Sequence, residues 1–239
     1  MPPLFHDLRT TIVALAALTA LGGAIARGAE ERAPCTEDAM IVFDASGSMS
    51  GNGWGYGSET AGMVSRIDKV RATLGKMLPH VTRFRRVGLI TYGPGVWDRC
   101  NVHLDLKPAA NATAPIMTAI NALIPAGKTP LSAAVAQAAE VLDYRNKPGL
   151  IVVVTDGEET CGGSPCDLGK ELAQEAVQLT VHIIGLRVKG YTWTGEQSLV
   201  EAKCLAERNR GLYLTVETED ELMEALEKAL GCPMTTRLQ

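Results

Sequence analysis

Five short apolar runs constrain the fold of this sequence most, because each run is continuously hydrophobic rather than alternating. They occupy residues 40–43, 87–92, 150–155, 181–186 and 212–216. Continuous hydrophobicity is typical of strands buried on both faces, as in a mostly parallel sheet covered by helices. Residues 102–106 alternate instead, which favours an edge strand with one wet face. The short Gly-Pro-Gly link at residues 93–95 is compatible with an antiparallel hairpin there.

Helical patterns lie between these runs, so that strand and helix alternate through most of the chain. The patterns cover residues 67–78, 115–124, 131–142, 168–179, 198–208 and 219–230. Thr218 precedes three acidic residues, which is typical of a capped helix start with negative charge at the positive end of the helix dipole. The sequence therefore predicts an α/β fold: a doubly wound, mostly parallel sheet with one antiparallel edge strand and helices on both faces.

The first residues have the pattern of a secretory signal. Arg9 precedes an apolar stretch at residues 11–26, and the small residues at its end suit cleavage after Ala26 or, as a second choice, Ala29. An uncleaved anchor is the alternative, but the stretch is shorter than the about 20 residues that a span needs. We therefore expect a signal peptide at 1–26, a linker at 27–37, the folded domain at 38–232 and a tail at 233–239. The mature protein would be periplasmic or secreted, with no stable membrane span.

Charge and composition exclude two classes of function. The net charge is −4 and Lys and Arg are scattered, whereas nucleic-acid binding needs clustered positive charge. The four histidines offer little catalytic material, and no nucleophile is followed by a base in a recognisable spacing. We expect neither a nucleic-acid partner nor an enzyme.

Oxygen-bearing side chains follow two of the predicted strands and precede a helix. Directly after the first run, alternate positions hold Asp44, Ser46 and Ser48. Asp156 directly follows the run at 150–155, and Thr129 precedes a helical pattern. Ligands of doubly wound sheets bind where loops leave the carboxyl ends of central strands. Carboxylate and hydroxyl oxygens suit a hard cation such as Mg²⁺. Each residue alone could also be a helix cap or turn residue.

Three motifs in this order resemble the metal-ion-dependent adhesion site of von Willebrand factor type A domains. They are DASGSM at 44–49, GKTPL at 127–131 and TDGEE at 155–159. The resemblance covers residues 38 to 230. It implies that Ser46 and Ser48 contact a divalent cation directly and that Thr129 does so directly or through water. It also implies that Asp44 and Asp156 act largely by holding water and orienting the other ligands.

The resemblance also implies a use for the ion, which is Mg²⁺ by expectation, with Ca²⁺ or Mn²⁺ as alternatives. Neutral hydroxyl ligands leave the cation short of negative charge, so a Glu or Asp carboxylate of a protein partner can take an open coordination position. The glycine-rich segment at 50–62 departs from the family pattern, and its Trp54 and Tyr56 could add contact area to the partner or pack locally. A metal-dependent hydrolase and a purely structural ion are the alternatives.

Six cysteines in an exported chain predict disulfides rather than a thiol or zinc site. Cys161 and Cys166 are separated by a flexible Gly-Gly-Ser-Pro turn, which favours a local pair. Family members whose domain ends are bridged imply a second pair between Cys35 and Cys232. Cys100 and Cys204 would then form a pair or remain thiols.

Overall fold

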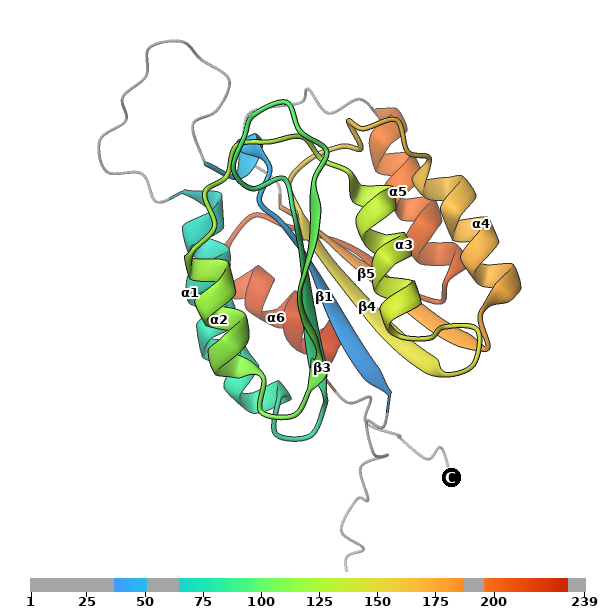
Figure 1. Ribbon diagram of the computed structural model, residues 1–239, viewed down its shortest axis with the longest axis horizontal. Helices are drawn as coiled ribbons and strands as arrows, with labels where there is room; N and C mark the ends of the chain where they lie inside the picture. Colours follow the sequence, from blue (N-terminus) through green and yellow to red (C-terminus); the bar gives the residue numbers. More distant parts are fainter. Residues whose placement is uncertain (1–36, 51–64, 187–195, 232–239) are drawn as a thin grey trace, which may run out of the picture. The chain divides into compact units, whose positions relative to one another are not determined.

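The structure is a computed structural model that describes residues 37–50, 65–186 and 196–231. In these ranges it has one six-stranded sheet flanked by helices (Figure 1). The strands are β1 (Asp38–Asp44), β2 (Val87–Tyr92), β3 (Val102–Ala109), β4 (Pro148–Thr155), β5 (Gln178–Leu186) and β6 (Tyr213–Val216). The helices are the short 3-10 turn η1 (Gly47–Ser50), α1 (Arg66–Val81), α2 (Thr113–Asn121), α3 (Leu131–Val141), α4 (Pro165–Glu175), α5 (Glu196–Arg208) and α6 (Glu219–Leu230).

The sheet has the predicted direction of its strands. Its order is β3-β2-β1-β4-β5-β6. Every neighbouring pair is parallel except β2 and β3, which are antiparallel. In β1 and β2, the residues are buried on both faces, whereas β3 alternates between half-buried and exposed residues. The prediction of a mostly parallel sheet with one antiparallel edge strand is confirmed.

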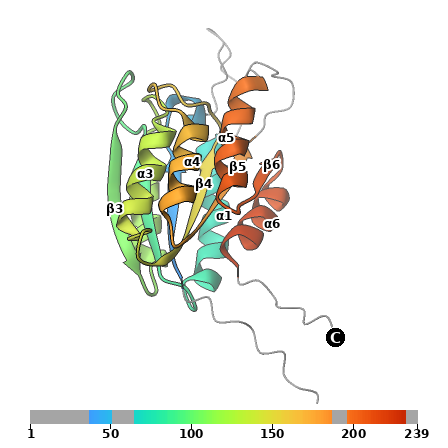
Figure 2. The same ribbon diagram turned by 90° about the vertical axis from the view of Figure 1, so that its right-hand side faces the viewer.

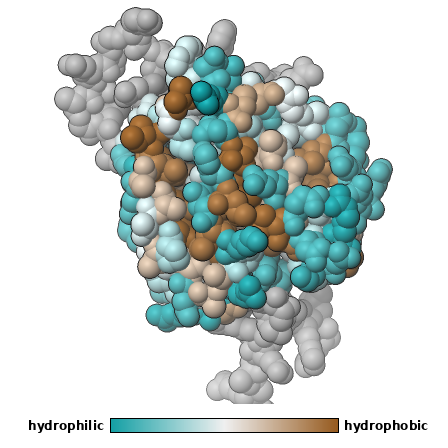
Figure 3. Space-filling view, viewed as in Figure 1, coloured by the Kyte–Doolittle hydropathy of each residue, from teal (hydrophilic) through white to brown (hydrophobic). Residues whose placement is uncertain are grey.

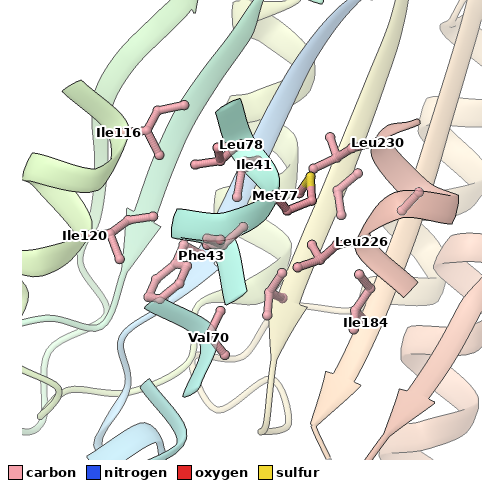
Figure 4. Close-up of a cluster of buried hydrophobic side chains, with 14 of the residues drawn as sticks. Ile41, Phe43, Val70, Met77, Leu78, Ile116, Ile120, Ile184, Leu226 and Leu230 are labelled. Carbon is pink, nitrogen blue, oxygen red and sulfur yellow. The ribbon is translucent and has the colours of Figure 1, made fainter. Parts of the chain in front are cut away.

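Each face of the sheet has its own hydrophobic core, and successive residues of β1 alternate between them. Ile41 and Phe43 pack with α1, α2 and α6, and Figure 4 shows side chains of these helices around them. Met40 and Val42 pack with α3, α4 and α5, the helices that cover the other face (Figure 2). Full burial of one such side chain contributes about 1.5–3 kcal/mol to folding. The two cores therefore explain why the strand sequences show no polar alternation.

Helix boundaries lie within a few residues of those expected, with the largest difference at α4. Thr218 and Glu221 form a complete capping box at the start of α6. The helix expected at 168–179 is α4, which begins at Pro165 and ends at Glu175. Ala176 is already extended, and Leu179 is buried as part of β5. The apolar spacing of this segment continues from helix into strand, so periodicity alone could not locate the end of the helix.

The predicted pair between Cys161 and Cys166 is wrong, as is the fate expected for Cys100 and Cys204. Cys161 is bonded to Cys100 and Cys166 to Cys204, with Cα–Cα distances of 5.9 and 5.1 Å. Pro165 starts α4, so that Cys166 lies in the first turn of a helix that packs against α5, which carries Cys204. Cys161 precedes this turn and lies beside the loop after β2. Cys161 and Cys166 therefore bond to different partners, although they are close in sequence.

Several predictions concern residues outside the described ranges. The signal peptide, the linker up to residue 36, the tail and the Cys35–Cys232 pair all fall there. Among the helices in the described ranges, none is long and apolar enough to cross a membrane.

Candidate metal-binding site

The carboxyl ends of β1 and β4 bring Asp44, a predicted site residue, together with Thr155. The strands are parallel neighbours, with Phe43 opposite Val154, so that Asp44 and Thr155 leave the sheet side by side. Asp44 Oδ1 accepts the backbone N–H of Ser46 at 2.7 Å, and Oδ2 accepts the hydroxyl of Thr155 at 2.6 Å. Both carboxylate oxygens therefore fix the loop that follows β1 to the end of β4. Figure 1 shows this loop and η1 at the top of the sheet.

The third loop, which carries Gly127 and Thr129, is bound to the loop after β1 through its backbone. Ser46 and Gly127 form an isolated parallel bridge, in which the N–H of Gly47 donates to the carbonyl of Gly127 at 3.0 Å. Gly93 permits this close packing, since its φ is +75° and a Cβ there would come within 2.8 Å of the Ser46 backbone. The segment that carries Thr129 is thereby held against the segment that carries Ser46.

Hydroxyls and carboxylates form a continuous chain across the site. Ser48 Oγ donates to Asp156 Oδ1 at 2.6 Å, and the Oγ atoms of Ser46 and Ser48 are 3.1 Å apart. Because the single proton of Ser48 is given to Asp156, Ser46 is the donor between the two serines. The remaining lone pairs of these hydroxyls are available to a cation.

Thr129 borders the same space from the other side. A Cβ at Gly157 would lie 3.4 Å from Thr129 Oγ1 and 3.6 Å from Ser48 Oγ, so both oxygens lie near one point beside Gly157. The Thr129 backbone is fixed by Thr160: its N–H donates to Thr160 Oγ1 at 2.8 Å, and its carbonyl accepts the Thr160 N–H at 3.0 Å. All five predicted metal residues thus lie in three loops at one end of the sheet.

Burial makes the charge of Asp44 costly. Its side chain is fully buried, and burial, reinforced by the negative charge of Asp156, raises the pKa of Asp44 from 3.8 to about 6. Burial and the charge of Asp44 also hold the pKa of the Tyr92 phenol well above its ordinary value, so that Tyr92 stays neutral. A cation would relieve the crowding of negative charge here.

Arg66 is a site residue that the sequence did not reveal. It is the first residue of α1, and its guanidinium donates to Asp156 Oδ2 and, at 3.1 Å, to the carbonyl of Ser48. The Asp156 side chain is fully buried, so Arg66 supplies the positive charge that this carboxylate needs. No spacing relates Arg66 to the three motifs, and only the position of α1 brings it to them.

The donor set fits a hard divalent cation held by oxygen. In the part of the chain that the structure describes, no three His, Cys, Asp or Glu side chains converge as in a zinc or carboxylate-rich calcium site. The converging groups are three hydroxyls, from Ser46, Ser48 and Thr129, beside two carboxylates. Oxygen ligands of this kind suit Mg²⁺ and Mn²⁺ better than soft metals. Trp54 and Tyr56, the residues expected to contact a partner, lie outside the described ranges.

The family follows from a match between residues 39–159 and the model of the von Willebrand factor type A domain. The chain belongs to this family. The match includes β1, the edge strand β3, β4 and all three motif loops, so the resemblance inferred from the motifs is confirmed.

Known proteins are similar to this chain at low sequence identity. The uncharacterized protein YwmC of Bacillus subtilis (strain 168) is 26% identical over 173 residues, which are 68% of this chain and 72% of YwmC. An aerotolerance-related membrane protein from Bacteroides fragilis has the same fold, with a TM-score of 0.58, 19% identity and coverage of 81% of this chain and 98% of that one.

A mussel protein of the same fold has been solved with metal bound. Proximal thread matrix protein 1 from the mussel byssus, with a zinc-occupied MIDAS motif, gives a TM-score of 0.55 at 19% identity, over 81% of this chain and 44% of that one.

Proposed function

We propose that this domain binds a divalent cation, Mg²⁺ in the first place and Ca²⁺ or Mn²⁺ as alternatives, and uses the cation to bind an acidic residue of a protein partner. The observation that carries the proposal is the convergence of the Ser46, Ser48 and Thr129 hydroxyls beside Asp44 and Asp156. The zinc-occupied motif of the mussel protein supports ion binding at such a site.

The donor set favours partner binding over a closed structural site. Asp44 has both oxygens engaged by Ser46 and Thr155, and Asp156 is engaged by Ser48 and Arg66. Each of these carboxylate oxygens already accepts a hydrogen bond, so we expect the neutral hydroxyls to be the main direct contacts of a cation. A cation so held keeps most of its positive charge and supplies an attachment point for a carboxylate oxygen. The partner's Glu or Asp would provide that oxygen.

We further propose that the domain is not an enzyme. The three histidines of the described ranges lie on α1, β3 and β5, and the imidazole of His182 accepts the backbone N–H of Leu212. Both serines of the site are committed to the hydroxyl chain with Asp156. The described part of the site therefore offers no histidine to activate a nucleophile.

We also propose that the protein is exported, with residues 1–26 as its signal. Two disulfides in the described ranges support an oxidising compartment. The amino-terminal sequence of protein recovered from outside the cytoplasm should begin at Arg27 or, for the second site, Glu30. A mature chain that starts at Met1 would contradict the cleavage.

Calorimetric titration with Mg²⁺ tests the metal site directly. The wild-type domain should bind one ion, and Ser46→Ala with Ser48→Ala should abolish binding without unfolding the domain. Ser164→Ala is the matched control, because its hydroxyl lies before α4 and donates to Asp167. Equal Mg²⁺ affinity in the double variant and the control would overturn the proposal.

A further inference from the structure

Large apolar side chains are exposed beside the candidate metal site. Val96 and Trp97, in the loop after β2, are 61% and 77% exposed, and Ile124, in the loop after α2, is 71% exposed. We call these three residues the rim patch. In the space-filling view, apolar surface appears at the upper left, above α1 and α2 (Figure 3). Clustered apolar exposure of this kind marks binding surfaces, whereas single exposed apolar residues are ordinary.

The two loops of the rim patch are bonded to each other. The N–H of Gly95 donates to the carbonyl of Ile124 at 2.9 Å, and Pro94 and Pro125 form an antiparallel bridge. Ile124 is thus part of this backbone contact, and Val96 is one residue away from it. The two loops that carry the rim patch therefore lie side by side.

The same loops adjoin the metal-site residues. A Cβ at Gly127 would lie 3.2 Å from the carbonyl oxygen of Val96, and the carbonyl of Gly127 accepts the N–H of Gly47. The N–H of Gly127 in turn donates to Gly93 at 2.7 Å. A single glycine therefore separates the backbone of the rim patch from the loop that carries Ser46 and Ser48.

The loop after β2 is held in a fixed conformation. Cys100 is bonded to Cys161, Asn101 Nδ2 donates to the carbonyl of Pro94 at 3.0 Å, and Lys128 pairs with Asp98 at 2.8 Å. Asp98 has a φ of 91°, a conformation that non-glycine residues keep only where the surroundings enforce it. An exposed tryptophan on a rigid loop loses little conformational freedom when it binds a partner.

We propose that the rim patch binds an apolar side chain of the same partner segment whose acidic residue is bound at the metal site. This inference rests on the proposed function and adds the second half of the recognition element. Arg99 and Lys128, which pairs with Asp98, belong to the same two loops, and their positive charges suit an acidic segment. The partner is therefore a protein segment in which Asp or Glu stands close to an aromatic or large aliphatic residue.

A phage-displayed library of random peptides tests this without knowledge of the natural partner. Selection on the wild-type domain in Mg²⁺ should retain peptides that combine Asp or Glu with a nearby apolar residue. One retained peptide is then synthesised, and its Kd is measured for the wild type and for Trp97→Ala with Ile124→Ser. The variant should bind it at least about tenfold more weakly, as expected for loss of a tryptophan at the centre of an interface. Its Mg²⁺ affinity should not change.

The matched control is Phe84→Ala with Val177→Ser. These residues are 46% and 59% exposed and precede β2 and β5, at the end of the sheet away from the site. Its peptide affinity should equal that of the wild type. Since all four side chains are exposed, neither variant creates a core cavity.

The outcomes separate the inference from the proposed function. Ion-dependent peptides that carry acidic residues without apolar enrichment, or a rim-patch variant with unchanged peptide affinity, would overturn the inference and leave the metal-dependent function standing. Selection that yields no peptide, or the same peptides in EDTA, would overturn the proposed function and the inference with it.

Discussion

At the scale of single residues, the buried carboxylate of Asp44 lowers the stability of the ion-free domain at neutral pH, while it supplies negative charge for a cation. Its buried carboxylate accepts two hydrogen bonds, yet burial and Asp156 raise its pKa from 3.8 to about 6. Without a cation, the folded domain therefore retains a proton on Asp44 at a pH where the unfolded chain has released it. The site is built to carry a charge that the protein alone stabilises poorly.

This gives a pH-dependent prediction for Asp44→Asn in EDTA. Because the folded pKa lies above the unfolded value, the contribution of Asp44 is most favourable below pH 4 and is lost as the pH rises through about 6. Between these values, the free energy of unfolding of the wild type should fall by up to about 3 kcal/mol relative to the variant. Urea unfolding at several pH values measures this difference. Parallel pH profiles would show that Asp44 titrates as an ordinary carboxyl.

Arg66 gives a second prediction at this scale. Arg66→Met removes the guanidinium from Asp156 and Ser48, so the ion-free domain should lose about 1–3 kcal/mol of stability in EDTA. The same change removes a positive charge from the cation site, so the Kd for Mg²⁺ should fall several-fold. Lys69→Met is the control, because Lys69 is an exposed cation of the same helix. Weaker Mg²⁺ binding in Arg66→Met would mean that Arg66 positions the site rather than balances its charge.

The sequence predicted which residues meet at the strand ends better than it predicted the residues that support them. Asp44, Ser46, Ser48, Thr129 and Asp156 stand in motifs whose spacing is set by strand ends, and the structure places them in three adjoining loops. Arg66 acts through contacts across the fold, and such contacts leave no pattern in one sequence. Whether the five residues bind a cation stays a prediction.

At the scale of elements, hydrophobic pattern predicted each strand and the antiparallel edge, whereas the disulfides required the topology. The short sequence separation favoured a pair between Cys161 and Cys166. However, α4 begins at Pro165, so Cys161 lies in the loop before the helix and Cys166 lies in its first turn. The bonds formed instead join elements far apart in sequence, with separations of 61 and 38 residues. Which helix packs against which loop cannot be read from spacing.

The two disulfides should therefore differ in their effect on ion binding. Replacing either pair by serine should cost about 2–4 kcal/mol of stability, since each closes a long loop. Cys100→Ser with Cys161→Ser frees the loops beside Gly127 and Asp156, and it should also weaken Mg²⁺ binding. Cys166→Ser with Cys204→Ser releases α4 from α5 and should leave the Kd unchanged. Calorimetry on both variants provides the comparison, and equal Mg²⁺ affinities would refute the role of the first bond in the site.

At the scale of the whole domain, the cores and the site occupy different regions. The apolar side chains of β1 and β4 are buried between helices on both faces, whereas the site residues lie in loops beyond the strand ends. The domain should therefore fold without a cation, and the cation should add stability only through its binding free energy.

The last prediction measures that addition by thermal unfolding. At a Mg²⁺ concentration of about 100 times its Kd, binding to the folded state alone contributes about 2.7 kcal/mol. For a domain of this size, each kcal/mol raises Tm by about 2–4 °C, so Mg²⁺ should raise Tm by about 5–10 °C above its value in EDTA. The variant Ser46→Ala with Ser48→Ala should unfold cooperatively in EDTA but show no shift, because its hydrophobic cores are intact and its cation ligands are gone. If instead the wild type unfolds in EDTA, folding and ion binding are one process. The loops beyond β1 and β4 would then be part of the folding core rather than a site supported by it.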